Sequence, residues 1–149
     1  MLPPYRSPRK MFQDLAAVWY PASNLDAGLE AELGDSYATL MKRLASDPDL
    51  AFLDAELAGR TSADTAPTPS PAAERKAFFF TVELIQLMQN VWFEFGLESN
   101  MNRDNPKNGG WMAVFQMWAN APSVIKNWQL SRGRYSTLFQ QFIDKLQRS

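Results

Sequence analysis

The residues best suited to chemistry are four polar side chains inside an otherwise apolar run, 77–97. They are Glu83, Gln86, Asn90 and Glu94. On a helical wheel with roughly 100° per residue, they fall within about 60° of Glu83. Carboxylates on one face of a bundle helix can bind metal ions, but such sites usually take further glutamates and Glu-x-x-His motifs from partner helices. This chain has no histidine and no second carboxylate pair in an apolar setting. We therefore interpret the stripe as a solvated or interface-facing strip and expect no metal and no cofactor.

A second group of residues that could bind a ligand is a run of aromatic rings near the C-terminus. Stacked rings could hold a base, a flavin or a lipid tail, although a helix face of this kind most often packs against another helix. Arg132 falls on the same wheel face, where its guanidinium could pair with Glu83 or Glu94. We interpret the rings as core and keep an aromatic pocket for a small molecule or lipid as the alternative. The residues of that pocket are Trp111, Phe115, Trp118, Trp128, Arg132 and Tyr135.

The composition excludes several classes of active site. Without cysteine or histidine there are no disulfides, no thiolate zinc sites, no cysteine nucleophiles and no histidine-dependent catalysis. A calcium loop also fails in the Asn/Gly-rich segment 98–110, because Pro106 and Phe115 fall at ligand places three and twelve. We therefore do not expect an enzyme.

The charge is nearly balanced, at −1 overall, which is not the basic excess of a nucleic-acid-binding protein. The N-terminus shows no signal-peptide pattern. We expect a cytoplasmic protein, either free or at the cytosolic face of a membrane if an upstream anchor is missing. The expected partner is a second copy or another protein, with no nucleic acid.

The elements that position these residues are predicted to be helices. The apolar run belongs to a long central helix, 74–98. In a second helix, 121–147, the apolar residues before and after Gly133 fall on the same face of the helical wheel. We predict one continuous C-terminal helix, bent at most at the glycine, that pairs antiparallel with the central one. The fold class is all-α, a bundle of four to six helices, with a shorter helix from about 110 to 120.

The N-terminal half carries shorter helical signals. Ser7-Pro8 is a good helix start, and Asn24 can cap a second helix. Asp47-Pro48 predicts the start of a further helix, and Gly59 predicts its C-terminal end. Segment 60–73 contains small, polar and proline residues, which predicts a flexible linker. We therefore divide the chain into an N-terminal helical segment 1–59, the linker 60–73 and a C-terminal helical core 74–149.

The C-terminal region, about residues 77–146, resembles a loose group of uncharacterised bacterial helical proteins. The resemblance is strongest from Trp111 to Leu146, where an aromatic helix precedes a proline turn, a tryptophan and a Tyr-Ser-x-x-Phe-x-x-Phe ending. The matching residues are Pro122, Trp128, Tyr135, Ser136, Phe139, Phe142, Ile143 and Asp144. Many members of the group carry this region behind transmembrane helices, which this sequence lacks. The resemblance implies an all-helical fold and no particular activity.

These observations favour a non-catalytic interaction or scaffold domain that self-associates as a homodimer. The central helix carries large rings in too many directions for two neighbouring helices to bury, and uncovered apolar patches usually mark an interface. The predicted interface residues are Glu83, Gln86, Asn90, Trp92, Glu94 and Phe95.

Overall fold

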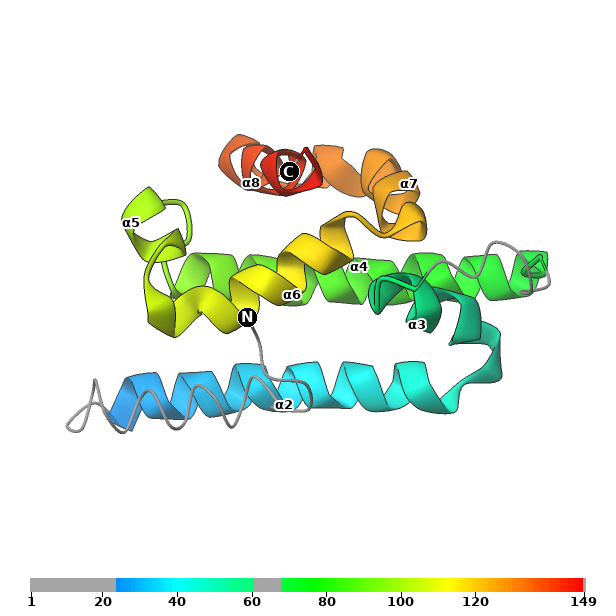
Figure 1. Cartoon of the computed structure of the whole chain (residues 1–149), viewed down its shortest axis with the longest axis horizontal. Helices are drawn as coiled ribbons and strands as arrows, with labels where there is room; N and C mark the ends of the chain where they lie inside the picture. The colour runs from blue at the N-terminus through cyan, green and yellow to red at the C-terminus, as the bar shows by residue number, and fades with distance from the viewer. Residues whose placement is uncertain (1–23, 61–67, 149) are drawn as a thin grey trace.

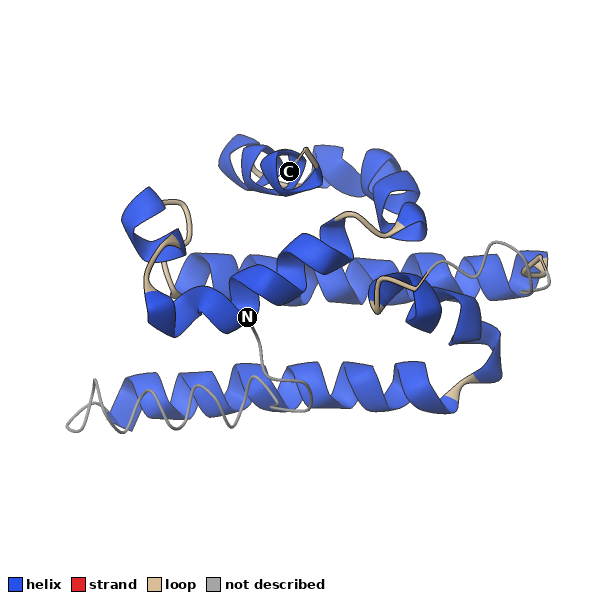
Figure 2. Cartoon of the chain, in the orientation of Figure 1, coloured by secondary structure: helices blue, strands red, loops and turns tan. Residues whose placement is uncertain are grey.

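The structure, a computed structural model of the chain, describes residues 24–60 and 68–148. The expected first helix, which starts at Ser7-Pro8, and the middle of the expected linker lie outside these ranges. The described ranges contain helices and turns and no strand, which confirms the all-α fold class (Figure 2). Seven α-helices are present in them, more than the four to six predicted. The difference arises from a one-turn helix in the expected loop and from a break in the C-terminal helix.

The helices in chain order are α2 (Asn24–Ser46), α3 (Ala51–Leu57), α4 (Pro71–Glu94), α5 (Asn100–Arg103), α6 (Gly109–Ala119), α7 (Pro122–Ser131) and α8 (Thr137–Gln147). Short 3-10 turns at Pro48–Leu50, Pro106–Asn108 and Arg132–Arg134 lead into or out of them. Figure 1 shows α4 running through the middle of the molecule, with α2 along one side and α7 and α8 on the other. The central helix of the prediction is thus also central in the fold.

Local signals determine where α4 begins and ends. Ser70 accepts a hydrogen bond from the backbone N–H of Ala73 at 3.1 Å, and a proline follows it at the first helical position. The helix therefore begins at Pro71, three residues before the predicted start and inside the expected linker. It ends at Glu94 and not at residue 98, because Gly96 adopts a left-handed φ of 61°. The N–H of Leu97 then bonds back to the carbonyl of Trp92 at 2.9 Å.

The N-terminal stop and restart signals are also observed. Asp47 accepts a hydrogen bond from the N–H of Asp49 at 3.0 Å, so that it caps the turn before α3 as predicted. Gly59 adopts a φ of 73° directly after α3. Each of these signals involves only a few neighbouring residues, so it can be predicted from the sequence.

The C-terminal segment is not one continuous helix, and this prediction is wrong. The helix α7 ends at Ser131, a 3-10 turn containing Gly133 follows, and Tyr135 is extended with a ψ of 160°. Ser136 then starts α8 by accepting a hydrogen bond from the N–H of Phe139 at 3.3 Å. A shared apolar phase on the wheel is compatible with two helices as well as one, and the serine cap favours two.

The predicted antiparallel pairing of the C-terminal segment with α4 is also wrong. In α7, Asn127 donates a hydrogen bond to the hydroxyl of Thr81 at 3.3 Å. In α8, the ring of Phe139 packs edge-on to Trp92 with centroids 5.4 Å apart. Contacts that advance along both segments in the same order cannot come from an antiparallel pair. The break at Arg132–Arg134 allows α7 and α8 to meet α4 separately.

One buried cluster connects the two halves of the described chain. It combines Leu44 and Leu53 from the N-terminal helices with Phe80, Trp111 and Trp128 from the C-terminal ones. The helices α2 and α3 therefore complete the core around α4. The proposed division into a segment, a linker and a separate core stays a prediction.

Candidate functional site

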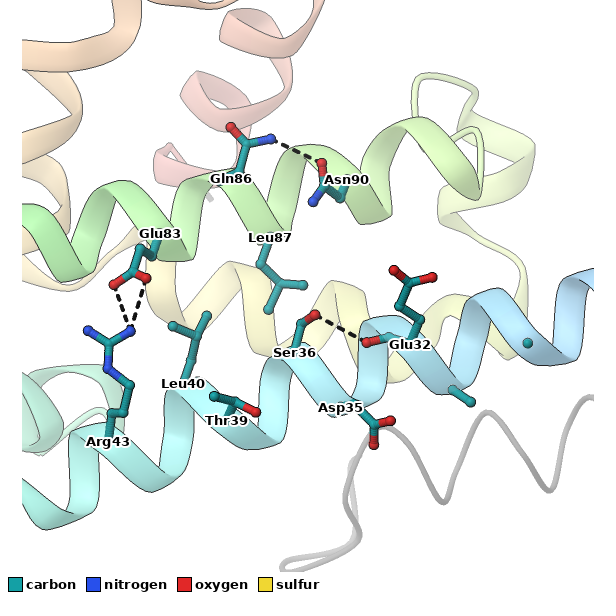
Figure 3. A pocket seen from close by; sticks show the side chains of 12 residues that line it. Glu32, Asp35, Ser36, Thr39, Leu40, Arg43, Glu83, Gln86, Leu87 and Asn90 are labelled. Atoms are coloured by element: carbon teal, nitrogen blue, oxygen red, sulfur yellow. Dashed lines mark hydrogen bonds and ion pairs between the residues drawn. The ribbon is translucent and has the colours of Figure 1, made fainter.

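An open groove lies between α2 and α4. It has a volume of about 660 Å³. Its apolar floor includes Leu40 and Leu87, and most of the other lining residues carry polar side chains (Figure 3). The full lining is Gly28, Ala31, Glu32, Asp35, Ser36, Thr39, Leu40, Arg43, Glu83, Gln86, Leu87 and Asn90. Three members of the predicted stripe, Glu83, Gln86 and Asn90, thus line the α4 side of the groove.

One end of the groove is closed by an ion pair. Arg43 donates hydrogen bonds to both carboxylate oxygens of Glu83, at 2.9 and 2.8 Å, and its guanidinium also lies 5.5 Å from the centroid of the Phe80 ring. The two paired side chains are each about half exposed, at 51% and 48%, so that the pair contributes at most about 1 kcal/mol. The pair joins α2 to α4 at the surface, above the buried apolar contacts between the two helices. The sequence offered no sign that Arg43 would be the partner of Glu83.

The remaining stripe residues lie on the surface of α4. Gln86 donates hydrogen bonds to the side-chain oxygens of Gln89 and Asn90, at 3.2 and 3.0 Å, and its side chain points away from α2 (Figure 3). Glu94 is exposed at the last turn of the helix. The stripe is therefore solvated, and it is not turned into the core of the molecule.

Two phenylalanines beside this stripe are exposed, and the sequence analysis did not separate them from the other rings. Phe79 is 55% exposed and Phe93 is 73% exposed, although α4 buries most of its other large side chains. The guanidinium of Arg75 lies 5.9 Å from the centroid of the Phe79 ring, and Phe78 packs edge-on against the same ring. We call the line formed by Arg75, Phe79, Gln86 and Phe93 the outer ridge of α4.

Trp92 and Phe95, which were expected to fill an interface, face the interior of the molecule. Trp92 is only 8% exposed, and its ring packs on Phe139 and Phe142 of α8. Phe95 is half-buried under the ammonium group of Lys107, 5.9 Å from the ring centroid. Through these contacts α8, which starts after the break that follows α7, covers Trp92. Neither ring is presented to a partner.

The aromatic residues of the alternative pocket form two packed clusters. In the first, Trp111, Phe115 and Trp118 of α6 are buried around Tyr37 of α2. The ring of Tyr37 stacks on Trp118 at 5.7 Å and meets Trp111 edge-on at 5.8 Å. These rings pack against one another as in a hydrophobic core.

The second cluster holds Trp128, Tyr135 and Phe139 around the α7–α8 turn. The indole N–H of Trp128 donates to the carboxylate of Asp144 at 2.9 Å, and Arg132 forms an ion pair with the same carboxylate. Arg132 thus pairs with Asp144 and not with Glu83 or Glu94. The clustered rings and the paired arginine connect α7 to α8.

Burial perturbs two tyrosines. It raises the pKa of Tyr37, which lies between two tryptophans, and it raises the pKa of Tyr135, where the nearby charge of Arg134 opposes the shift. Hydrogen bonds from the Lys76 ammonium to Asp49 and Asp47 raise the pKa of that lysine. None of these groups changes its ionisation near neutral pH, so they act through packing and hydrogen bonding.

No group of three or more carboxylates within 24–60 and 68–148 is arranged to hold a metal ion. In the same ranges, no helix combines the length and apolarity needed to cross a membrane.

Comparison of the chain with known protein families, curated proteins and solved structures finds no match.

Proposed function

We propose that this chain is a non-catalytic helical interaction domain that associates with a second copy of itself through the outer ridge of α4. The observation that carries the proposal is the exposure of Phe79 and Phe93 on a helix whose other faces are covered. Exposed apolar side chains that line up on one face of a helix point to an interface more than apolar side chains scattered singly over a surface do. Asn90 and Glu94 give the ridge a polar border on one side, as polar residues commonly rim protein interfaces.

The proposal keeps four of the residues expected from the sequence and replaces two. Glu83, Gln86, Asn90 and Glu94 lie on or beside the exposed face of α4. Phe79 and Phe93 take the place of Trp92 and Phe95 as the apolar anchors. In this role the protein acts as a scaffold, and the weak resemblance to bacterial helical proteins is compatible with it.

Sedimentation velocity over about 1–100 μM tests the proposal. We expect the wild type to shift from monomer to dimer, and the double substitution F79S/F93S to remain monomeric with unchanged far-UV circular dichroism. Because both rings are exposed in the monomer, this variant should fold. The matched control is L130S, which removes another exposed apolar side chain, 68% exposed, from α7. A wild type that stays monomeric throughout, or a control that dissociates the dimer equally, contradicts the proposal.

A second candidate function, binding of a small polar molecule, is favoured by the groove between α2 and α4. Its volume of about 660 Å³ lies within the range typical of ligand sites, roughly 300–1,000 Å³. Its hydroxyl, amide and carboxylate groups suit a polar ligand and not a lipid tail. Native mass spectrometry of protein purified from cells tests this, because a retained small molecule adds a defined mass. Loss of that mass in the variant S36L/T39L, with the dimer intact, assigns the molecule to the groove.

A further inference from the structure

We infer that the two copies meet through an antiparallel contact of α4 with α4, with Gln86 on the twofold axis; this inference rests on the proposed self-association. The spacing of the outer ridge suggests the geometry. Phe79 precedes Gln86 by seven residues and Phe93 follows it by seven. A step of seven turns an α-helix by roughly 20° less than two full turns, so the three side chains form nearly one line.

The equal spacing makes the ridge complementary to itself. Seven residues span about 10 Å of helix axis, so each phenylalanine lies the same distance from Gln86. In an antiparallel pair centred on Gln86, Phe79 of one copy therefore meets Phe93 of the other, twice. A closed twofold contact needs this reciprocity, since residue i must meet j while j meets i. A parallel pair would instead place each phenylalanine against the same residue of the other copy.

The charges along α4 favour the same orientation. Arg75 makes the N-terminal end of the ridge basic, whereas the neighbouring Lys76 already pairs with Asp47 and Asp49 of the same chain. Glu94 lies at the C-terminal end of the ridge. An antiparallel contact places the basic end of each copy beside the acidic end of the other, whereas a parallel contact brings like charges together. Helix dipoles also oppose one another favourably in the antiparallel arrangement. Charge complementarity and spacing thus select a second copy in one orientation.

The absence of cysteine from the sequence allows a direct test by single-cysteine cross-linking of the full chain. Under mild oxidation, we expect Q86C alone to form a disulfide-linked dimer in high yield, because a residue on a twofold axis meets its own copy. We expect F79C and F93C to give little dimer separately and at least a fivefold higher yield when mixed. The matched control is Q129C, an exposed glutamine on α7 that should give only background.

The charge argument has its own test. We expect E94K to raise the dimer dissociation constant at least fivefold, and E94Q to raise it less, because the lysine repels the basic end of the partner. An increase in ionic strength should weaken the wild-type dimer and reduce the difference between the variants.

The outcomes separate this inference from the proposed function. A wild type that dimerises by sedimentation, together with background cross-linking of Q86C, overturns the antiparallel geometry and leaves self-association standing. A wild type that stays monomeric overturns both. High yields from F79C alone and F93C alone, with no gain on mixing, indicate a parallel contact and also overturn the inference.

Discussion

The carboxylate of Glu56 in α3 caps the first turn of α7, 67 residues further along the chain. It accepts hydrogen bonds from the backbone N–H of Ser123 at 2.6 Å and from the hydroxyl of the same residue at 2.8 Å. The local N-cap position is Ala121, whose side chain cannot accept a hydrogen bond. Glu56 therefore satisfies from a distance a donor that a serine or aspartate usually satisfies locally.

We expect E56A to lower the free energy of unfolding by about 1–2 kcal/mol, because it removes the cap and leaves the N–H of Ser123 without this acceptor. Urea denaturation followed by circular dichroism measures the loss. E56Q keeps one acceptor oxygen and should lose less. The control E98A removes an exposed carboxylate and should change stability by less than about 0.5 kcal/mol. Equal losses in E56A and E98A contradict a capping role.

We expect G96A to destabilise the fold by about 1–3 kcal/mol. Gly96 has a φ of 61°, and a Cβ built there lies 2.7 Å from the amide nitrogen of Asn102, which itself donates to the carbonyl of Gly96 at 2.9 Å. The control G28A places a methyl group in open space within α2 and should raise stability by up to about 1 kcal/mol. Thermal unfolding of the two variants should therefore shift in opposite directions. A stabilised G96A would show that the chain does not turn here as described.

We expect D144A to lower stability by about 2–3 kcal/mol and D144N by less. Asp144 accepts from the indole of Trp128 and pairs with Arg132, so alanine leaves a buried indole N–H without an acceptor. Asparagine retains an oxygen for the indole and loses only the partly exposed ion pair. Urea denaturation of both variants measures the difference. If the two lose the same amount, the ion pair and not the indole contact is the important one.

We expect stability to fall as the pH rises above about 10. Burial raises the pKa of Tyr37 above its ordinary value of 10.0, so the unfolded chain releases this proton first. The stabilisation is therefore complete below pH 10 and is lost as the pH rises through the pKa of the folded state. Tyr135 contributes in the same direction. The double variant Y37F/Y135F should show a smaller loss between about pH 9 and pH 11 in denaturation experiments. An unchanged pH dependence would contradict burial of the two hydroxyls.

Sequence rules identified most of the helices because the relevant signals are local. The cap at Asp47 and the stop at Gly59 act within one or two turns, and the apolar spacing of 77–97 marks a central helix by itself. The cap at Ser70 and the turn at Gly96 are equally local, but the sequence analysis overlooked them, so the predicted range 74–98 begins three residues and ends four residues too late. The absence of histidine and cysteine likewise removed several kinds of active site. The same rules missed the break before α8, although the Ser136 cap is a local signal. The apolar residues of α7 and α8 fall on one face of a continuous helical wheel, so the periodicity alone does not reveal the turn between the two helices.

Only the tertiary structure decided which side chains of α4 are covered. Trp92 and Phe93 are adjacent large aromatic residues, yet α8 covers Trp92 while Phe93 is 73% exposed. The partners of the carboxylates are likewise distant in the sequence. Glu83 pairs with Arg43, forty residues away, and Glu56 accepts a hydrogen bond from Ser123. Periodicity shows which side of each helix is apolar and which is polar, but the burial of a side chain depends on where the other helices lie. The sequence by itself determined most of the helices and their apolar faces, while the packing of α2, α7 and α8 around α4 decided which face of α4 remained exposed.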